Sequence, residues 1–183
     1  MARIERCARR ASAAPVLLAA AAALLAWPVS GLPAAGSAAA ECAADSYRQL
    51  DFWLGDWDVY DLGGTTAVAR AHITPILDGC VVHERYESQH TVGESFSIYD
   101  RTRGLWHQTW VTSRGRLLQV EGRLKDGRLE LAGSYLNEQG ERTGIRAAWW
   151  AASGGVRERA EISADAGRTW KPEFDLIFRP HRE

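Results

Sequence analysis

Short segments in which apolar and polar residues alternate fill the chain from residue 55 to residue 179. A period of two is typical of β-strands with one buried face, and turn residues such as Gly, Asp and Asn separate the segments. No long helical period follows Leu54, and Asp45 or Ser46 is expected to cap one short helical turn before it. The pattern predicts ten strands, near residues 55–61, 66–76, 80–90, 94–100, 105–112, 116–124, 128–136, 142–151, 156–163 and 169–179.

Every predicted connection is short. Asp78-Gly79 and Asp126-Gly127 are typical of tight turns, because glycine adopts positive φ without strain. Sequential antiparallel strands joined in this way form a meander, and a meander of this size hides its edges by closing on itself. We therefore predict an all-β fold, an antiparallel up-and-down β-barrel of about ten strands with a short N-terminal helix. A β-sandwich is the alternative, although it would need longer crossover connections.

The first 40 residues have a different composition. Four Arg and one Glu stand in the first ten residues, an apolar stretch follows over residues 11–29, and Ala38-Ala39-Ala40 fits a cleavage site. This arrangement predicts a secretory signal peptide over 1–40 and a single barrel domain over 41–183, in the periplasm or outside the cell. A membrane anchor fits less well because Pro15 and Pro28 interrupt the stretch. A lipoprotein signal through Cys42 is disfavoured by Glu41.

Charge and cysteine content narrow the class of protein further. Without the leader, 22 − 4 = 18 basic and 23 − 1 = 22 acidic residues remain, a net charge of −4. No basic face suggests nucleic acid as a partner, and no later apolar run approaches membrane-spanning length. Two cysteines remain, Cys42 and Cys80, and in an oxidising compartment we expect them to form a disulfide.

Three segments carry a resemblance. Phe52-Trp53-Leu54-Gly55-Asp56-Trp57 resembles the opening of the lipocalin and fatty-acid-binding-protein (calycin) superfamily, in which the Trp of Gly-x-Trp packs across the closed end of the barrel. Together with Ile73–Cys80 and Trp106–Val111, it is similar to an uncharacterised group of exported bacterial lipocalin-like proteins. The resemblance covers residues 50 to 178 and implies the fold, not an activity.

Two further likenesses concern cofactors and sugars. Haem-binding barrels open similarly, but their iron-ligating His lies near the last strand, whereas His181 lies past it, and their glycine-rich first strand is absent. The segment Ser163-x-Asp165-x-Gly167-x-Thr169-Trp170 resembles the Asp-box hairpin of sialidase propellers. A single copy cannot build a propeller, so we interpret it as the turn between the last two strands.

Aromatic and polar side chains define the candidate binding site. Trp106, Gln108 and Trp110 share one face of their strand, so two large rings could flank one amide in the lumen. Glu84 and Tyr86 share a face of the third strand and could join Gln108, with Arg146 or Arg70 as partner of a buried Glu84. The alternatives are that the rings only fill the core and that the charged residues form structural pairs.

No established catalytic or cofactor motif accompanies these residues. The sequence has no nucleophile elbow, P-loop or dinucleotide fingerprint. His72, His83 and His107 lie on different strands without paired spacing, so we expect no metal site and no cofactor.

Three functions fit these features. The sequence favours a non-enzymatic barrel that binds a small apolar or amphipathic ligand. The alternatives are an enzyme with a polar lumen built on Glu84, Tyr86 and Gln108, and a filled barrel that serves as a structural or interaction domain. The ligand, the oligomeric state and the strand faces that line the lumen are left open by the sequence.

Overall fold

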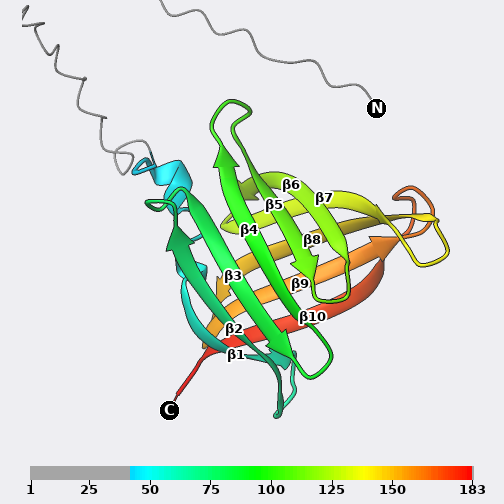
Figure 1. Ribbon diagram of the computed structural model, residues 1–183, viewed down its shortest axis with the longest axis horizontal. Helices are drawn as coiled ribbons and strands as arrows, with labels where there is room; N and C mark the ends of the chain where they lie inside the picture. Colours follow the sequence, from blue (N-terminus) through cyan, green and yellow to red (C-terminus); the bar gives the residue numbers. More distant parts are fainter. Residues whose placement is uncertain (1–41, 183) are drawn as a thin grey trace, which may run out of the picture. The chain divides into compact units, whose positions relative to one another are not determined.

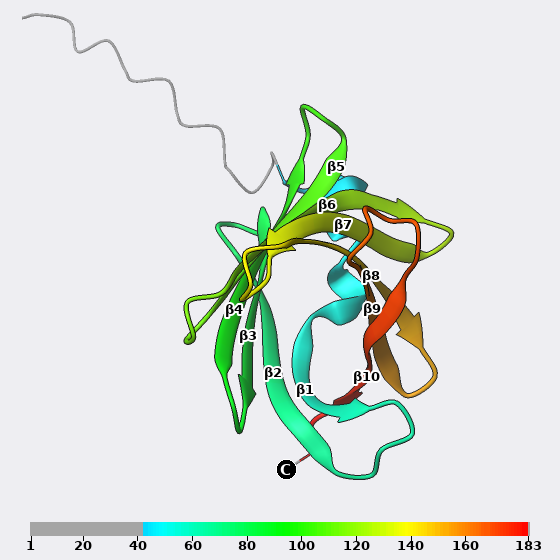
Figure 2. The same ribbon diagram turned by 90° about the vertical axis from the view of Figure 1, so that its right-hand side faces the viewer.

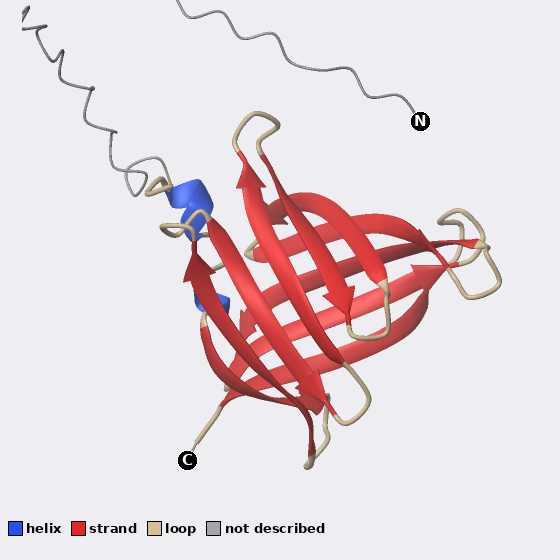
Figure 3. Ribbon diagram, viewed as in Figure 1, coloured by secondary structure: helices blue, strands red, loops and turns tan. Residues whose placement is uncertain are grey.

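The computed structural model describes residues 42–182 of the chain, so the predicted signal peptide over 1–40 lies outside the described residues. Two short 3-10 turns, η1 (Asp45–Arg48) and η2 (Asp51–Trp53), precede the strands. The ten strands are β1 (Gly55–Asp61), β2 (Ala67–Ile76), β3 (Val81–Ser88), β4 (Val92–Asp100), β5 (Leu105–Thr112), β6 (Leu117–Lys125), β7 (Arg128–Leu136), β8 (Arg142–Ala152), β9 (Gly155–Ser163) and β10 (Lys171–Pro180). Short loops join them throughout (Figure 3).

The ten strands form one closed antiparallel barrel (Figure 1). Each strand pairs with its neighbours in the chain, and β1 pairs with β10 to complete the ring, with Val59 opposite Phe178. Closure gives every strand two neighbours and leaves no unpaired edge. The prediction of a ten-stranded up-and-down barrel is confirmed, and the alternative of a β-sandwich is wrong, because no crossover interrupts the strand order.

The tight turns follow from local backbone chemistry. Asp126 and Gly127 alone connect β6 to β7, with φ of 50° and 75°. Positive φ at both central residues is typical of a type I′ turn, whose twist matches that of the flanking strands. The turn between β2 and β3 also has positive φ at Asp78 and Gly79, and it begins one residue earlier than predicted, at Leu77 with φ 50°.

The hairpin between β9 and β10 is the Asp-box-like segment, as predicted. The Asp165 carboxylate accepts hydrogen bonds from the Thr169 amide at 2.8 Å and the Thr169 hydroxyl at 2.6 Å. The Ser163 hydroxyl donates to it at 2.8 Å. These contacts lower the pKa of Asp165 to about 2, with the Thr169 hydroxyl the largest cause. The turn takes up the residues before Lys171, which is why β10 begins two residues later than predicted.

One end of the barrel is filled by the N-terminal segment. Figure 2 shows the second of the two helical turns, η2, lying within the ring of strands. Leu50 and Trp53 are fully buried there, and the Trp53 ring lies 6.0 Å from the Phe178 ring and 6.1 Å from the Trp149 ring. The Trp57 indole donates to the Trp53 carbonyl at 2.9 Å. The apolar core therefore lies at this end and closes it.

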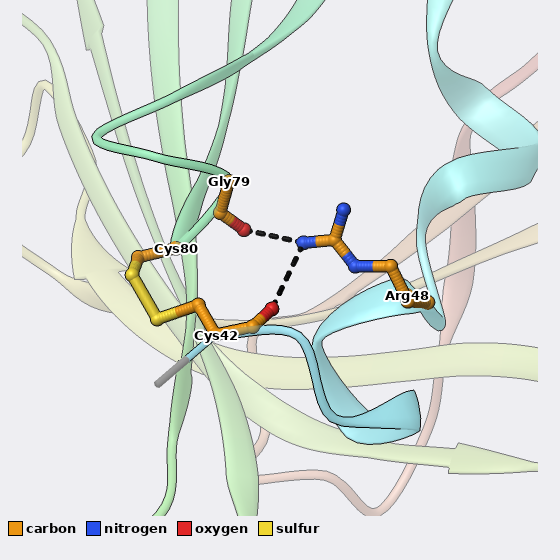
Figure 4. The surroundings of a disulfide bond; sticks show 4 residues. All are labelled: Cys42, Arg48, Gly79 and Cys80. Atoms are coloured by element: carbon orange, nitrogen blue, oxygen red, sulfur yellow. Dashed lines mark hydrogen bonds between the residues drawn. A yellow bond between two sulfur atoms is a disulfide. The ribbon is translucent and has the colours of Figure 1, made fainter. Parts of the chain in front are cut away.

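A disulfide attaches this segment to the barrel (Figure 4). Cys42 and Cys80 are bonded, with their Cα atoms 5.1 Å apart, as the sequence predicted. The Arg48 guanidinium donates to the carbonyls of Gly79 and Cys42 from the opposite side. The covalent bond and these hydrogen bonds hold η1 against the β2–β3 turn. Among residues 42–182, no helix has the length and apolar character needed to cross a bilayer.

Candidate functional site

The inward face of β5 carries the predicted aromatic and amide residues. Trp106 and Gln108 are buried and Trp110 is half-buried, whereas the alternate position Val111 is exposed. Trp106 lies in the closed end, where its indole donates to the Gln49 side-chain oxygen at 2.9 Å. Gln108 and Trp110 lie further along the strand and line a cavity. Trp106 thus belongs to the core, while the other two face open space.

The inward face of β3 carries Glu84 and Tyr86. Glu84 is only 5% exposed, and its carboxylate accepts a hydrogen bond from the Ser95 hydroxyl at 2.8 Å. The Tyr86 ring meets the Trp110 ring edge-on, with centroids 5.9 Å apart. Alternation along β3 sends His83, Arg85 and Glu87 to the other face. The structure therefore brings Glu84, Tyr86, Gln108 and Trp110 to one cavity.

Small residues on β4 make room for these side chains. Ser95 and Ser97 are fully buried, and Ser97 accepts a hydrogen bond from the Gln108 amide at 3.1 Å. Gly93, on the same face, contacts the Trp110 ring so closely that no side chain would fit between them. These three positions were not among the residues expected at the site. The sequence does indicate that they lie together, because Gly93, Ser95 and Ser97 are spaced two residues apart and therefore share one face of the strand.

The cavity has a volume of about 340 Å³. Aromatic rings of Tyr86, Trp110, Trp149 and Phe174 form much of its wall, with aliphatic side chains such as Leu118 and Leu176 between them. Exposed residues at strand ends and in loops, among them Asp61, Arg116 and Glu173, lie at its rim. These residues mark the end of the barrel opposite the N-terminal segment as the open one. The volume is at the lower end of the range for small-molecule sites.

A second carboxyl, Glu158, reaches the cavity from β9. In the closed strand order β9 is four strands away from β3, so Glu84 and Glu158 extend from nearly opposite walls. Glu158 is not evident from the sequence, because its neighbours Arg157 and Arg159 make the strand resemble a solvated one. The signal was available, since Glu158 shares its face with the buried Val156 and Ala160.

Burial changes the protonation of both carboxyls. Burial raises the pKa of Glu84 to about 7, and the Ser95 hydroxyl opposes that rise. Burial, reinforced by the charge of Glu84, raises the pKa of Glu158 well above its usual value. Burial also raises the pKa of Tyr86 to about 12, with Glu158 and Glu84 as further causes. Near neutral pH Glu84 is therefore about half protonated, and both carboxyls keep their protons to a higher pH than a solvent-exposed Glu does, as is expected of like charges that share an apolar site.

Trp149 on β8 lies beside Glu158. The two residues pair across the β8–β9 ladder, and the indole N–H is close enough to Glu158 to favour its charged form. The N–H nevertheless falls outside ordinary hydrogen-bond geometry, and it is buried without a partner within the described part of the chain. A buried donor of this kind costs about 1–3 kcal/mol, so the site gains stability when an acceptor reaches it.

Arg146 does not join these residues. It is exposed on the outer face of β8, where it pairs with Glu161 at 2.6 Å and stacks on the Trp170 ring. Arg70, the other partner considered for Glu84, is exposed and lies 3.7 Å from Asp58. Both face outward because they alternate with buried neighbours. Within residues 42–182, no cationic side chain pairs with Glu84 or Glu158.

The three histidines also point away from the lumen. His72 pairs with Asp56, His83 with Glu94 and His107 with Glu121, each within a different part of the outer surface. Among the described residues, no group of three or more His, Cys, Asp or Glu side chains is placed to hold a metal ion.

A larger hollow of about 630 Å³ lies on the outer wall, over β7, β8 and β9. Three of its cationic residues already have carboxylate partners: Arg159 and Arg146 both pair with Glu161, and Arg157 pairs with Asp175. Arg128 and Arg157 lie over the Trp150 ring. Because these groups satisfy one another and the hollow is open to water, the lumen is the stronger candidate site.

The fold and the cavity define a class, a closed ten-stranded β-barrel with a pair of carboxyls in an aromatic-lined lumen. Neither a scan against protein-family models nor a search of curated proteins finds a match for this chain.

Proposed function

We propose that this chain is an exported binding protein that holds a small apolar or amphipathic molecule inside its barrel. The observation that carries the proposal is the cavity of about 340 Å³, walled by Tyr86, Trp110, Trp149 and Phe174. Ligand sites are typically concave, mostly apolar and supplied with a few placed polar groups. Glu84 and Gln108 are such groups, and each is held in position by a serine of β4.

The proposal includes export of the protein and a relationship to lipocalin-like proteins. The leader over residues 1–40 supports export, and the Cys42–Cys80 disulfide is compatible with an oxidising compartment. The Gly55-x-Trp57 opening and the closed end on which Trp57 packs support a relationship to the lipocalin-like barrels.

Dye binding tests the proposal. Purified protein is titrated with the neutral lipophilic dye N-phenylnaphthylamine, and dye emission is followed together with tryptophan emission. We expect dye emission to rise with saturable binding and tryptophan emission to fall, because Trp110 and Trp149 line the cavity. The proposal is contradicted if dye emission rises linearly without saturation. It is also contradicted if no member of a panel of apolar competitors displaces the dye.

A matched pair of variants locates the bound dye. Ala147 faces the cavity and is buried, whereas Ala148, the next residue of β8, faces outward. Ala147→Phe should weaken dye binding at least about tenfold, equivalent to about 1.4 kcal/mol, and Ala148→Phe should leave it unchanged. Leu118→Trp, nearer the open end, serves if Ala147→Phe does not fold. Equal affinity in all variants would place the dye outside the lumen and refute the proposed site.

The second candidate function is an enzyme that works in the same cavity. The raised pKa values of Glu84 and Glu158 favour it, because perturbed carboxyls beside a tyrosine suit general acid–base chemistry. The two functions differ in what happens to the bound molecule. Mass spectrometry of ligand extracted before and after incubation would show an unchanged molecule for a binding protein and a converted one for an enzyme. A filled-barrel domain has less support, because the lumen retains open volume.

A further inference from the structure

The charges around the cavity are strongly one-sided. Four acidic side chains line it, two in the interior (Glu84 and Glu158) and two at the rim (Asp61 and Glu173). Arg116 is the one cation among the lining residues, and its guanidinium lies 4.6 Å from the centroid of the Tyr135 ring. An anionic ligand such as a fatty acid would therefore meet acidic groups both at the entrance and at depth. The electrostatics of the cavity favour positive charge.

The aromatic walls favour the same charge. Tyr86, Trp110, Trp149 and Phe174 surround the space between the carboxyls. A cation over the face of such rings gains about 0.5–2 kcal/mol, with the larger value where water is excluded. An aromatic or aliphatic group on the ligand would pack against the same rings. A molecule with an ammonium group and an apolar body would satisfy both features.

Three polar groups in the interior of the cavity, two carboxyls and an indole N–H, lack the partners that binding of such a ligand would supply. Neither Glu84 nor Glu158 has a cationic partner among residues 42–182, and the buried Trp149 N–H has no acceptor there. An ammonium group would replace the protons that the carboxyls retain. Charged Glu158 could then accept a hydrogen bond from Trp149 by a small adjustment of its side chain, so one ligand would satisfy the two carboxyls and the indole N–H.

We infer that the lumen binds a small organic amine in its ammonium form, with the ammonium group between Glu84 and Glu158 and the apolar body against Trp110 and Trp149. This inference rests on the proposed binding function and adds the chemical class of the ligand. On binding, each carboxylic acid that becomes charged releases its proton to solvent, while the ammonium group keeps its own. Asp61 and Glu173 at the rim attract the cation, and Arg116 is the group that opposes it.

Three probes that share one apolar group test the inference. Naphthylethylamine is a cation, naphthylethanol is neutral and naphthylpropanoate is an anion, and each is titrated into the purified protein by calorimetry at pH 8. We expect the amine to bind at least about tenfold more tightly than the other two, equivalent to about 1.4 kcal/mol. Its affinity should fall as the pH is lowered from 8 to 6, because Glu84 then retains its proton, and binding should release protons to the buffer.

Charge-removing variants distinguish the carboxyl pair from general attraction to an acidic protein. Glu84→Gln and Glu158→Gln should each weaken amine binding about tenfold or more relative to naphthylethanol binding. Glu87→Gln is the matched control, because Glu87 lies on the outer face of β3 and is exposed. It should alter neither probe.

The outcomes separate the inference from the proposed function. If naphthylethanol or naphthylpropanoate binds as tightly as the amine, the inference fails and the binding function stands. The same conclusion follows if the lipophilic dye binds in the lumen and the amine does not. If neither the dye nor any probe binds, the proposed function itself fails, and the inference fails with it.

Discussion

Three features of its surroundings determine the pKa of Glu84. Strand alternation directs it inward, the barrel removes its water, and Ser95 supplies its hydrogen bond. The hydrogen bond opposes the effect of burial without cancelling it, so the pKa rises from 4.5 to about 7. Desolvation changes the pKa more than the Ser95 hydrogen bond does, and no positively charged side chain lies beside the carboxyl to offset it. A residue that would be an ordinary surface acid on the other face of β3 thus becomes a proton-binding group.

The raised pKa predicts how stability depends on pH. The folded protein holds a proton on Glu84 that the unfolded chain releases, so stability falls as the pH rises from 4.5 towards 7. Since a tenfold change in proton affinity is worth about 1.4 kcal/mol, the loss attributable to Glu84 approaches about 3 kcal/mol. Urea unfolding at several pH values should show a smaller loss for Glu84→Gln than for wild type. Glu87→Gln should follow wild type, and identical curves for Glu84→Gln and wild type would refute the raised pKa.

At the scale of elements, β4 leaves room for the cavity because its inward face has no large side chains beside Trp110 and Gln108. Its inward face carries Gly93, Ser95 and Ser97, which are small, opposite the large Trp110 and Gln108 of β5. The register places Gly93 across from Thr112 and Ser95 across from Trp110, so the indole leans over the glycine. Small and large residues on adjacent strands are thus complementary, which lets aromatic rings enter the lumen without filling it.

The complementarity predicts the effect of adding one methyl group. Gly93→Ala places a Cβ within the Trp110 ring, so the ring must move into the cavity. We expect a loss of about 1–3 kcal/mol in the free energy of unfolding, typical of overpacking, together with weaker dye binding and altered tryptophan emission. Gly144→Ala on β8 is the control, because its added Cβ would meet the Trp170 ring at 3.6 Å, an ordinary contact. Equal behaviour of the two variants in unfolding and dye titrations would contradict this account.

The strand boundaries could be predicted from the sequence more completely than the residues of the candidate site. The strands could be predicted to within two residues at every end, because alternation and turn residues are local signals. Glu84, Tyr86, Gln108 and Trp110 could be predicted as a set, because residues two apart share a face. Arg146 could not be placed correctly, since both faces of β8 contain apolar residues and only the closed barrel shows which face is inside. Glu158 was missed because its neighbours Arg157 and Arg159 make the strand resemble a solvated one.

At the scale of the whole molecule, the two ends of the barrel differ. The N-terminal segment fills one end with Leu50 and Trp53 and is attached there by the disulfide, while the other end leads to the cavity. Access to the lumen is therefore from one side, and the carboxyl pair lies between that opening and the apolar core. The disulfide acts on the closed end and not on the cavity walls.

The disulfide should matter to stability more than to binding. It closes a loop with a sequence separation of 38, for which the chain-entropy model gives about 4 kcal/mol. We expect the double variant Cys42→Ser, Cys80→Ser to unfold at lower urea concentration, and wild type in reducing agent to match it. Reducing agent should not alter the double variant itself. If the double variant, or wild type in reducing agent, unfolds at the same urea concentration as oxidised wild type, the prediction is contradicted, and the noncovalent contacts of Arg48 and Trp53 suffice to hold the N-terminal segment.

By itself, the sequence determined the strands, their turns, the pairing of the two cysteines and the set of side chains that share each strand face, because each of these depends on nearby residues or on simple counting. Only the tertiary structure decided which face lines the lumen, that Glu158 reaches Glu84 from across the barrel, and that Trp106 serves the core while Trp110 faces a cavity. These facts depend on closure of the ring, which brings together residues distant in the chain and shields them from bulk water. The protonation of the carboxyl pair follows from that closure.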